Sequence, residues 1–131
     1  MKPQIISLPK ITDQRGNLSF MEFPTHLPFE IARTFWTYNV PGGQERDAHA
    51  YKTQHEFIVA LSGSFDVTIK DQQGNESSFQ LNRSYFGLYL PPLTWRTVNN
   101  FSTNAFALHL CSGPYNETEY IRDFNAFAKW R

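Results

Sequence analysis

Apolar and polar residues alternate along much of the chain, and this alternation predicts strands. In the segment SFDVTIK (64–70), Phe65, Val67 and Ile69 share one face while polar residues share the other. Similar runs recur about every eight to twelve residues, separated by turn residues, as in sandwiches and barrels. The predicted strands are 5–8, 17–23, 31–40, 56–61, 64–70, 77–81, 87–90, 94–98 and 105–111.

The hydrophobic period changes only near the C-terminus. Asn116 followed by Glu119 resembles a capping box, with Asn in place of the usual Ser or Thr. Tyr120, Phe124 and Phe127 then recur at helical spacing. The pattern therefore predicts an all-β unit with a short C-terminal helix, and we expect its aromatic side chains to pack on the sheets.

Length and charge narrow the class of protein. A chain of 131 residues fits one domain, covering residues 1–131, and carries no internal repeat or linker. Twelve basic and twelve acidic residues leave no cationic excess, so neither nucleic acid nor an anionic membrane is an expected partner. No apolar run approaches about eighteen residues, and the start MKPQIISLPKITDQ does not resemble a signal peptide. We therefore expect a cytoplasmic protein, which the single Cys111 also fits.

The stretch RDAHAYKTQHE (46–56) carries the clearest motif. The spacing of Gly43, His49, Tyr51, Glu56 and Gly63 resembles the first cupin motif, in which two histidines and one glutamate ordinarily bind a metal. Tyr51 stands where the second histidine is expected. The resemblance implies a small cupin-type β-barrel, also called a double-stranded β-helix.

A looser second cupin motif lies at 91–100, where Arg96 replaces the last ligand histidine. A guanidinium is a permanent cation without a lone pair to donate, so Arg96 would repel a metal ion. His49, Glu56 and the neutral phenol of Tyr51 are a poor ligand set for the three or four donors that a tight site needs. We therefore expect neither a bound metal nor another cofactor.

A narrower resemblance covers the chain from Thr12 to Phe127. The segments VPGGQERDAHAYK, GSFDVTI, LNRSYFGLYLPPLTWR, NFS and YNETEYIRDF resemble the WxcM-like nucleoside-diphosphate-sugar 3,4-ketoisomerases. That family implies a metal-independent isomerase that moves the ketone of dTDP-4-keto-6-deoxyglucose from C4 to C3. The product leads to 3-amino-3,6-dideoxysugars of polysaccharides and glycosylated products. Relatives are dimers with exchanged N-terminal strands, so a homodimer is expected.

The chemistry assigns roles to the motif residues. The C4 carbonyl acidifies the hydrogen on C3, so a base must remove it and an acid must deliver a proton to C4 through an enediol. His49 is the predicted base because histidine titrates near neutral pH. The family signature R-G-x-H-A-H is matched at Arg46 and His49 but departs at Asp47 and Tyr51.

Strand alternation places Tyr51 on the same face as His49, and a phenol with a pKa of about 10 is a donor rather than a base. Three outcomes therefore stay open. The protein is a competent isomerase with Tyr51 as acid, an isomerase with a different stereochemical outcome at C4, or a non-catalytic relative that only binds nucleotide sugar. A related sugar-nucleotide epimerase is a weaker alternative because its usual His–Asp arrangement is not evident.

The remaining candidate residues are cationic or hydrogen-bonding side chains for the substrate. An enediolate oxygen needs preorganised donors, for which the candidates are Arg46, Arg96 and Tyr38. The diphosphate needs positive charge, and no Gly-rich phosphate loop is present. The candidates for that contact are Arg15, Arg33, Arg46 and Lys52.

The other histidines are less informative. His55 lies either in the pocket or exposed at a strand edge, whereas His26 precedes a proline in a loop. His109 sits in an apolar strand, which favours a hydrogen-bonded histidine of the barrel over a ligand.

Overall fold

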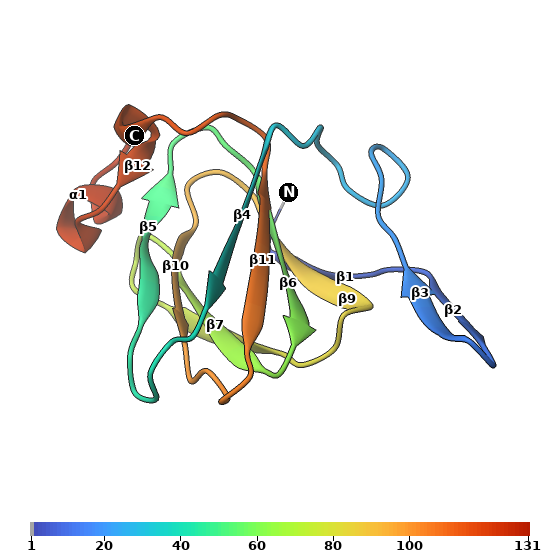
Figure 1. Ribbon diagram of the computed structural model, residues 1–131. Coiled ribbons are helices and arrows are strands. Elements are labelled where there is room, and N and C mark those ends of the chain that lie inside the picture. The colour runs from blue at the N-terminus through green and yellow to red at the C-terminus, as the bar shows by residue number, and fades with distance from the viewer. Residues whose placement is uncertain (1) are drawn as a thin grey trace.

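The computed structural model describes residues 2–131 and contains two five-stranded antiparallel sheets that face each other (Figure 1). The first sheet has the order β1 (Gln4–Ser7), β9 (Phe86–Leu90), β6 (Glu56–Ser62), β11 (Phe106–Cys111) and β4 (Arg33–Tyr38). The second has the order β12 (Tyr120–Ile121), β5 (Arg46–Tyr51), β10 (Trp95–Asn99), β7 (Phe65–Lys70) and β8 (Glu76–Leu81). This is the predicted cupin-type, all-β architecture.

The main core lies between the two sheets and follows the predicted alternation. Phe65, Val67 and Ile69 of β7 point inward and are at most 9% exposed. They meet Ile58 of β6 and Leu88 of β9 from the other sheet in one apolar cluster. Burial of each such side chain contributes about 1.5–3 kcal/mol, so this interface is the main source of stability.

Two glycines of the first cupin motif hold turns that other residues would strain. Gly43 precedes β5 with a φ of 85°, and Gly63 follows β6 with a φ of 65°. A Cβ atom on Gly63 would also lie 2.7 Å from the Cα of Ala105. The glycines thus fix the turns at which β5 begins and β6 ends.

The C-terminal segment differs from the prediction. Asn116 caps only a 3-10 turn, η1 (Glu117–Glu119), and the chain then extends into β12. Tyr120 pairs with Tyr51 of β5 in this strand, so it is a sheet residue rather than part of a helix. The helix α1 (Phe124–Ala128) starts later, capped by Asp123, and buries Phe127. Pairing with the free edge of β5 therefore replaces the first predicted helical turn.

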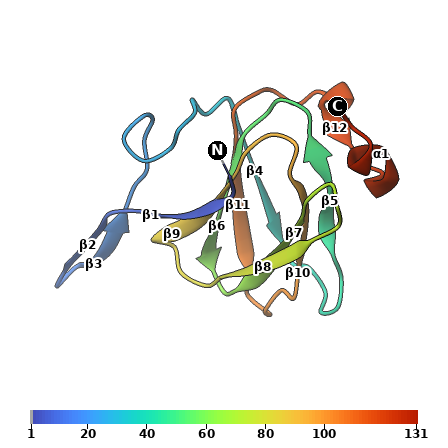
Figure 2. The ribbon, with the colours of Figure 1, turned by 180° about the vertical axis from the view of Figure 1, so that it is seen from behind.

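The N-terminal arm, formed by β2 (Lys10–Asp13) and β3 (Gly16–Ser19), stands away from the barrel in both ribbon views (Figures 1 and 2). The strand β2 was not predicted, and the predicted strand 17–23 is shorter than expected. Every residue from 11 to 20 is exposed, including Ile11, Leu18 and Phe20. Within one chain, the arm makes a hairpin without a core of its own. Among residues 2–131, no helix is long and apolar enough to cross a membrane.

Candidate active site

A pocket of about 340 Å³ opens where β4 and β5 meet the C-terminal segment. The strand β4 contributes inward-facing side chains, β5 contributes its first half, and the segment 115–122 closes one side. The lining residues are Arg33, Phe35, Arg46, Asp47, His49, Tyr115, Tyr120 and Arg122. Cationic and aromatic side chains therefore dominate this pocket, as suits an anionic ligand that also carries a ring.

His49 lies in the wall of the pocket and is only 2% exposed. Within residues 2–131, neither of its ring nitrogens has a hydrogen-bond partner. Burial, together with the nearby cation of Arg96, lowers the pKa of His49 to about 3. The imidazole is therefore neutral and has a free lone pair, although the lowered pKa makes it a weaker base than an ordinary histidine.

A bulge in β5 sets the direction of His49. The register between β10 and β5 shifts after the pair Arg96–His49, and Asp47 in the shifted part has a φ of 62°. This left-handed conformation suits glycine, which the related signature carries here, but aspartate tolerates it better than most residues. Bulges beside sites redirect side chains, so Asp47 preserves the local backbone that the signature glycine would favour.

Three aromatic rings meet at the back of the pocket and form the ring cluster of His49, Tyr51 and Tyr120. Their centroids lie 4.6 Å apart for His49–Tyr51, 4.8 Å for His49–Tyr120 and 4.9 Å for Tyr51–Tyr120, all edge to face. The two tyrosines differ in access, because Tyr120 lines the pocket whereas Tyr51 is fully buried behind it. Burial and the carboxylate of Glu56 raise the pKa of Tyr51 above its usual value.

Arg33 links the hydroxyl groups of the ring cluster. Its Nη2 donates to the Tyr51 hydroxyl at 3.0 Å and to the Tyr120 hydroxyl at 3.4 Å. The Tyr51 hydroxyl in turn donates to the Tyr120 hydroxyl at 3.3 Å. On the other side of the pocket mouth, the Arg122 guanidinium lies 4.3 Å from the centre of the Tyr120 ring. Each tyrosine thus accepts from Arg33, and of the two it is Tyr120 that lines the pocket.

The ion cluster of Arg96, Glu56 and His109 lies beneath the ring cluster. Arg96 is fully buried and pairs with one carboxylate oxygen of Glu56, while Nδ1 of His109 lies 2.7 Å from the other. Although burial alone would raise it, Arg96 and His109 hold the pKa of Glu56 at about 2. The second nitrogen of His109 lies 3.3 Å from the Thr37 hydroxyl and 3.4 Å from a carboxylate oxygen of Asp47.

This ion cluster decides whether the metal of the cupin motif would fit. Both oxygens of Glu56 are already engaged, one by the permanent cation of Arg96. The carboxylate therefore has no free lone pair directed at an ion next to His49, and Arg96 places a positive charge in the position of a ligand. The residues present do not fit a metal, and the chemistry of the pocket is that of its own side chains.

The structure brings some of the predicted site residues together and separates others. Arg33, Arg46 and His49 line the pocket. Tyr51 and Arg96 lie behind it, in contact with each other, the guanidinium being 5.0 Å from the ring centre. His55 lies outside the pocket and bonds the Tyr89 hydroxyl at 2.7 Å.

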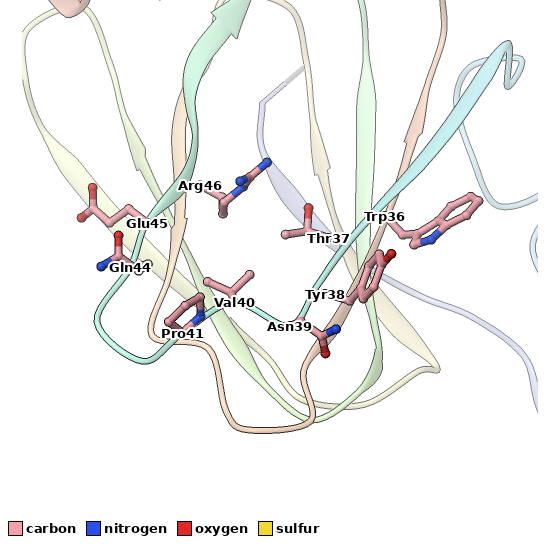
Figure 3. Close-up of a pocket in the computed structure, with 9 residues that line it drawn as sticks. All are labelled: Trp36, Thr37, Tyr38, Asn39, Val40, Pro41, Gln44, Glu45 and Arg46. Atoms are coloured by element: carbon pink, nitrogen blue, oxygen red, sulfur yellow. The ribbon is translucent and has the colours of Figure 1, made fainter.

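Tyr38 and Lys52 do not line this pocket, and their contacts with the substrate stay a prediction. Arg33 and Phe35 face inward from β4, so strand alternation turns Tyr38 to the outer face, where it stacks on Phe106. Figure 3 shows Tyr38 beside Trp36 in a separate, open pocket that Arg46 borders. Lys52 follows the end of β5, and its amine lies over the Trp130 ring at 4.9 Å.

Arg15 also lies outside the pocket of its own chain. It occupies the turn of the N-terminal arm, where it bonds Asp13 at 2.7 Å and its side chain is 90% exposed. The arm carries it away from the barrel (Figure 2). A role in substrate binding would therefore require the arm to reach the site of another subunit.

Sequence reasoning missed the residues that the C-terminal segment adds to the pocket. Tyr115, Tyr120 and Arg122 all lie in or next to the segment YNETEYIRDF, which was interpreted as a helix packed on the sheets. The helical spacing of Tyr120 and Phe124 concealed the extended backbone at β12. The resemblance of this same segment to the ketoisomerases was the available signal that it does more than pack.

Comparisons with known proteins agree in family and fold. The chain matches the FdtA family, described as WxcM-like, C-terminal, over residues 1–131. It is 34% identical to the TDP-4-oxo-6-deoxy-alpha-D-glucose-3,4-oxoisomerase of Aneurinibacillus thermoaerophilus, covering 99% of this chain and 93% of that protein.

Two solved structures are similar over nearly their whole length. A 3,4-ketoisomerase from Helicobacter canadensis superposes with a TM-score of 0.93 at 35% identity, covering 98% of this chain and 96% of that one. A mutant of the 3,4-ketoisomerase QdtA from Thermoanaerobacterium thermosaccharolyticum, solved in complex with TDP-4-keto-6-deoxyglucose, also has a TM-score of 0.93. It is 30% identical, over 97% of this chain and 91% of its own.

Proposed function

The chain belongs to the FdtA family of WxcM-like proteins, and from this premise we propose that it is a nucleotide-sugar 3,4-ketoisomerase. Its substrate is a dTDP-4-keto-6-deoxyhexose, whose ketone it moves from C4 to C3 without a metal. The reaction belongs to the biosynthesis of deoxysugars for polysaccharides. The relatives named for this activity, at 34% and 35% identity, support the assignment.

One observation carries the proposal, namely the buried and unpaired imidazole of His49. Buried polar groups are nearly always hydrogen-bonded, because leaving one unpaired costs about 1–3 kcal/mol. Among residues 2–131, His49 is one of four such exceptions, and of these four it alone has two unpaired atoms. It faces a pocket whose other walls carry Arg33, Arg46 and Arg122. A neutral base surrounded by cations suits a reaction in which a carbon acid loses a proton and an oxyanion forms.

The proposed reaction starts with His49 taking the proton from C3 of the sugar. The electrons of the broken C–H bond form the C3–C4 double bond, and the C4 carbonyl electrons move to O4, where Arg33 stabilises the enediolate. The His49 imidazolium then gives its proton to O4. The Tyr51 and Tyr120 hydroxyls of the ring cluster are hydrogen-bonded to each other. One of these phenols delivers a proton to C4 and recovers one from the C3 hydroxyl. The ketone now lies at C3 and every protein group is restored.

Substrate binding falls to the cations at the pocket mouth. Arg46 lines both the pocket of His49 and the separate pocket of Figure 3. None of the ion pairs among residues 2–131 involves Arg46. Its guanidinium is therefore free to hold a diphosphate oxygen in the bidentate way that arginine allows. Arg96 acts through His49 and Tyr51, since it has no access to the pocket.

The N-terminal arm supports the proposal of a homodimer with exchanged N-terminal strands. Its exposed apolar residues Ile11, Leu18 and Phe20 have no core of their own to join, and an isolated hairpin is at best marginally stable. Packing on a second copy would cover them and would bring Arg15 to another subunit. The substrate class and the single buried Cys111 suit a cytoplasmic enzyme.

The position of Tyr51 favours one alternative, a non-catalytic protein that binds the sugar nucleotide. The phenol stands where the related signature has a second histidine, and its buried hydroxyl does not line the pocket. A binding protein would keep the cationic pocket and lose turnover. Activity, rather than affinity, therefore separates the two functions.

The test is proton NMR of the wild type with dTDP-4-keto-6-deoxyglucose in deuterated buffer. We expect loss of the C3 proton signal and growth of the 3-keto sugar, and His49→Asn should slow both by about 10²–10⁴-fold. His55→Asn is the matched control, because His55 lies outside the pocket. Binding of TDP without any change in the sugar spectrum would instead identify the non-catalytic alternative.

A further inference from the structure

The proposed reaction needs a phenol that can reach the sugar, and the two tyrosines of the ring cluster are not equivalent in this respect. Tyr51 is 0% exposed and is separated from the pocket, whereas the ring of Tyr120 forms part of the pocket wall beside His49. A proton donor must come within about 2.6–3.2 Å of the atom that it protonates. Only Tyr120 of this pair is placed to meet that condition.

The hydrogen bonds of the two tyrosines also favour Tyr120 as the proton donor. A phenol can donate one hydrogen bond, and the Tyr51 hydroxyl donates its hydrogen bond to the oxygen of Tyr120 at 3.3 Å. The proton of Tyr120 is then free to point into the pocket. Its oxygen accepts from both Tyr51 and Arg33, and these two donors would stabilise the phenolate that remains after the proton has left.

The charges around Tyr120 add to this arrangement. The Arg122 guanidinium lies over its ring at 4.3 Å and is held there by bonds from Nε and Nη2 to Glu117 at 2.6 and 3.1 Å. Tyr120 therefore has Arg33 as a donor at its hydroxyl and the Arg122–Glu117 pair at its ring face. Tyr51 also has Arg33 at its hydroxyl and Arg96 near its ring, but burial and the carboxylate of Glu56 raise its pKa and disfavour a phenolate there.

We propose that Tyr120 is the catalytic acid of this chain, which gives its hydroxyl proton to C4 and recovers the proton of the C3 hydroxyl, while Tyr51 is a positioning residue. The O–H bond of Tyr120 breaks as the C4–H bond forms from the electrons of the enediol double bond. The C3–O–H proton then returns to the phenolate as the C3 carbonyl forms. The assignment rests on the isomerase function proposed above and explains how the chain manages without the second histidine.

The experiment compares Tyr120→Phe with Tyr51→Phe by proton NMR in deuterated buffer. This assay separates exchange of the C3 proton from formation of the 3-keto sugar. His49 alone exchanges the C3 proton, whereas formation of the 3-keto sugar also needs the acid. We expect Tyr120→Phe to retain C3 exchange but to form the 3-keto sugar at least about 10²-fold more slowly. Tyr51→Phe should slow product formation only about five- to ten-fold, since one neutral hydrogen bond to Tyr120 is lost.

Tyr85→Phe is the matched control, because Tyr85 packs on Phe86 and Lys10 outside the pocket, and it should behave as wild type. Melting temperatures of all variants test whether the fold is intact. We expect them to match wild type, because phenylalanine keeps the ring contacts. Unchanged product formation in Tyr120→Phe, a larger loss in Tyr51→Phe, or loss of C3 exchange in folded Tyr120→Phe would each overturn the assignment. A wild type that neither exchanges nor converts the sugar would overturn the proposed function, and the role of Tyr120 with it.

Discussion

The ring cluster and the ion cluster lie in the same barrel and each buries a histidine, but the two histidines have opposite surroundings. His109 is 0% exposed and its nitrogens lie near Glu56, Thr37 and Asp47. His49 is 2% exposed and neither nitrogen has a partner among the described residues. A buried polar group without partners destabilises the fold, so the comparison supports the proposal that His49 is kept free for a ligand, while His109 is a bonded group of the barrel.

The two clusters also differ in charge. In the ion cluster, the carboxylate of Glu56 neutralises Arg96 where no solvent reaches. Near the edge of the ring cluster lie the guanidiniums of Arg33 and Arg122. Arg122 pairs with Glu117, whereas none of the ion pairs among residues 2–131 involves Arg33. The charges of Glu56 and Arg96 thus compensate each other within the chain, although one nitrogen of Arg96 has no hydrogen-bond partner. The ring cluster would gain its counter-charge from an anionic substrate.

The largest effect should come from breaking the ion cluster with Glu56→Gln. Arg96 would remain buried without its counter-charge, and removal of one partner from a buried pair destabilises proteins by about 3–5 kcal/mol. Urea unfolding at neutral pH measures the change in the free energy of unfolding. The exposed pair of Lys70 and Glu76, 3.5 Å apart, supplies the control Glu76→Gln, for which we expect at most about 1 kcal/mol. Equal losses in the two variants would contradict the structural role of the ion cluster.

The second effect follows from the pKa of His49, which is about 3 in the folded protein against 6.5 for the ordinary side chain. Between these values the unfolded chain binds a proton that the folded chain does not, so stability is present above about pH 6.5 and is lost as the pH falls. The contribution of this one group amounts to about 2 kcal/mol between about pH 7 and about pH 5.

Urea unfolding of the wild type and His49→Asn at both pH values isolates that contribution. The variant should lose about 2 kcal/mol less on acidification than the wild type does. Glu56, with a pKa of about 2, changes stability in the same direction but only below its ordinary value of 4.5, so it does not disturb this window. His55→Asn controls for the other histidine with a lowered pKa. Identical pH dependence in the wild type and His49→Asn would show that His49 is not held neutral by burial.

The sequence predicted the barrel well because alternation and turn glycines are local signals. The faces of β7 and the turn at Gly63 follow from period and spacing, whereas the pairing of His49 with Arg96 was not predicted. The sequence did not predict that Tyr38 lies on the outer face of β4. Strand alternation would have placed its side chain opposite those of Arg33 and Phe35 once their inward direction was known.

The C-terminal segment shows why part of the site could not be predicted. Its residues satisfy a helical period, but the free edge of β5 offers backbone hydrogen bonds that only an extended segment can make, and β12 takes them. Whether an edge is free depends on the whole fold rather than on the segment. Tyr120 and Arg122 reach the pocket through this long-range pairing, which no local pattern reports.

The smallest effect concerns Asp47, the residue that joins the two clusters. Its carboxylate lies 3.4 Å from His109, and its backbone, at a φ of 62°, forms the bulge that directs His49. Asp47→Gly removes the carboxylate but favours the left-handed backbone, so we expect its stability to stay within about 1 kcal/mol of wild type. Isomerase activity should persist, because the bulge is retained.

Asp47→Ala is the matched variant, since it also removes the carboxylate but places a Cβ atom at the same positive φ. The alanine variant should be about 1–2 kcal/mol less stable than the glycine variant, and His49 should be displaced with the bulge, lowering activity. The difference between the two variants therefore measures the backbone alone, because the lost contact with His109 is common to both. Equal stability and activity of Asp47→Gly and Asp47→Ala would mean that the positive φ of residue 47 does not set the direction of His49.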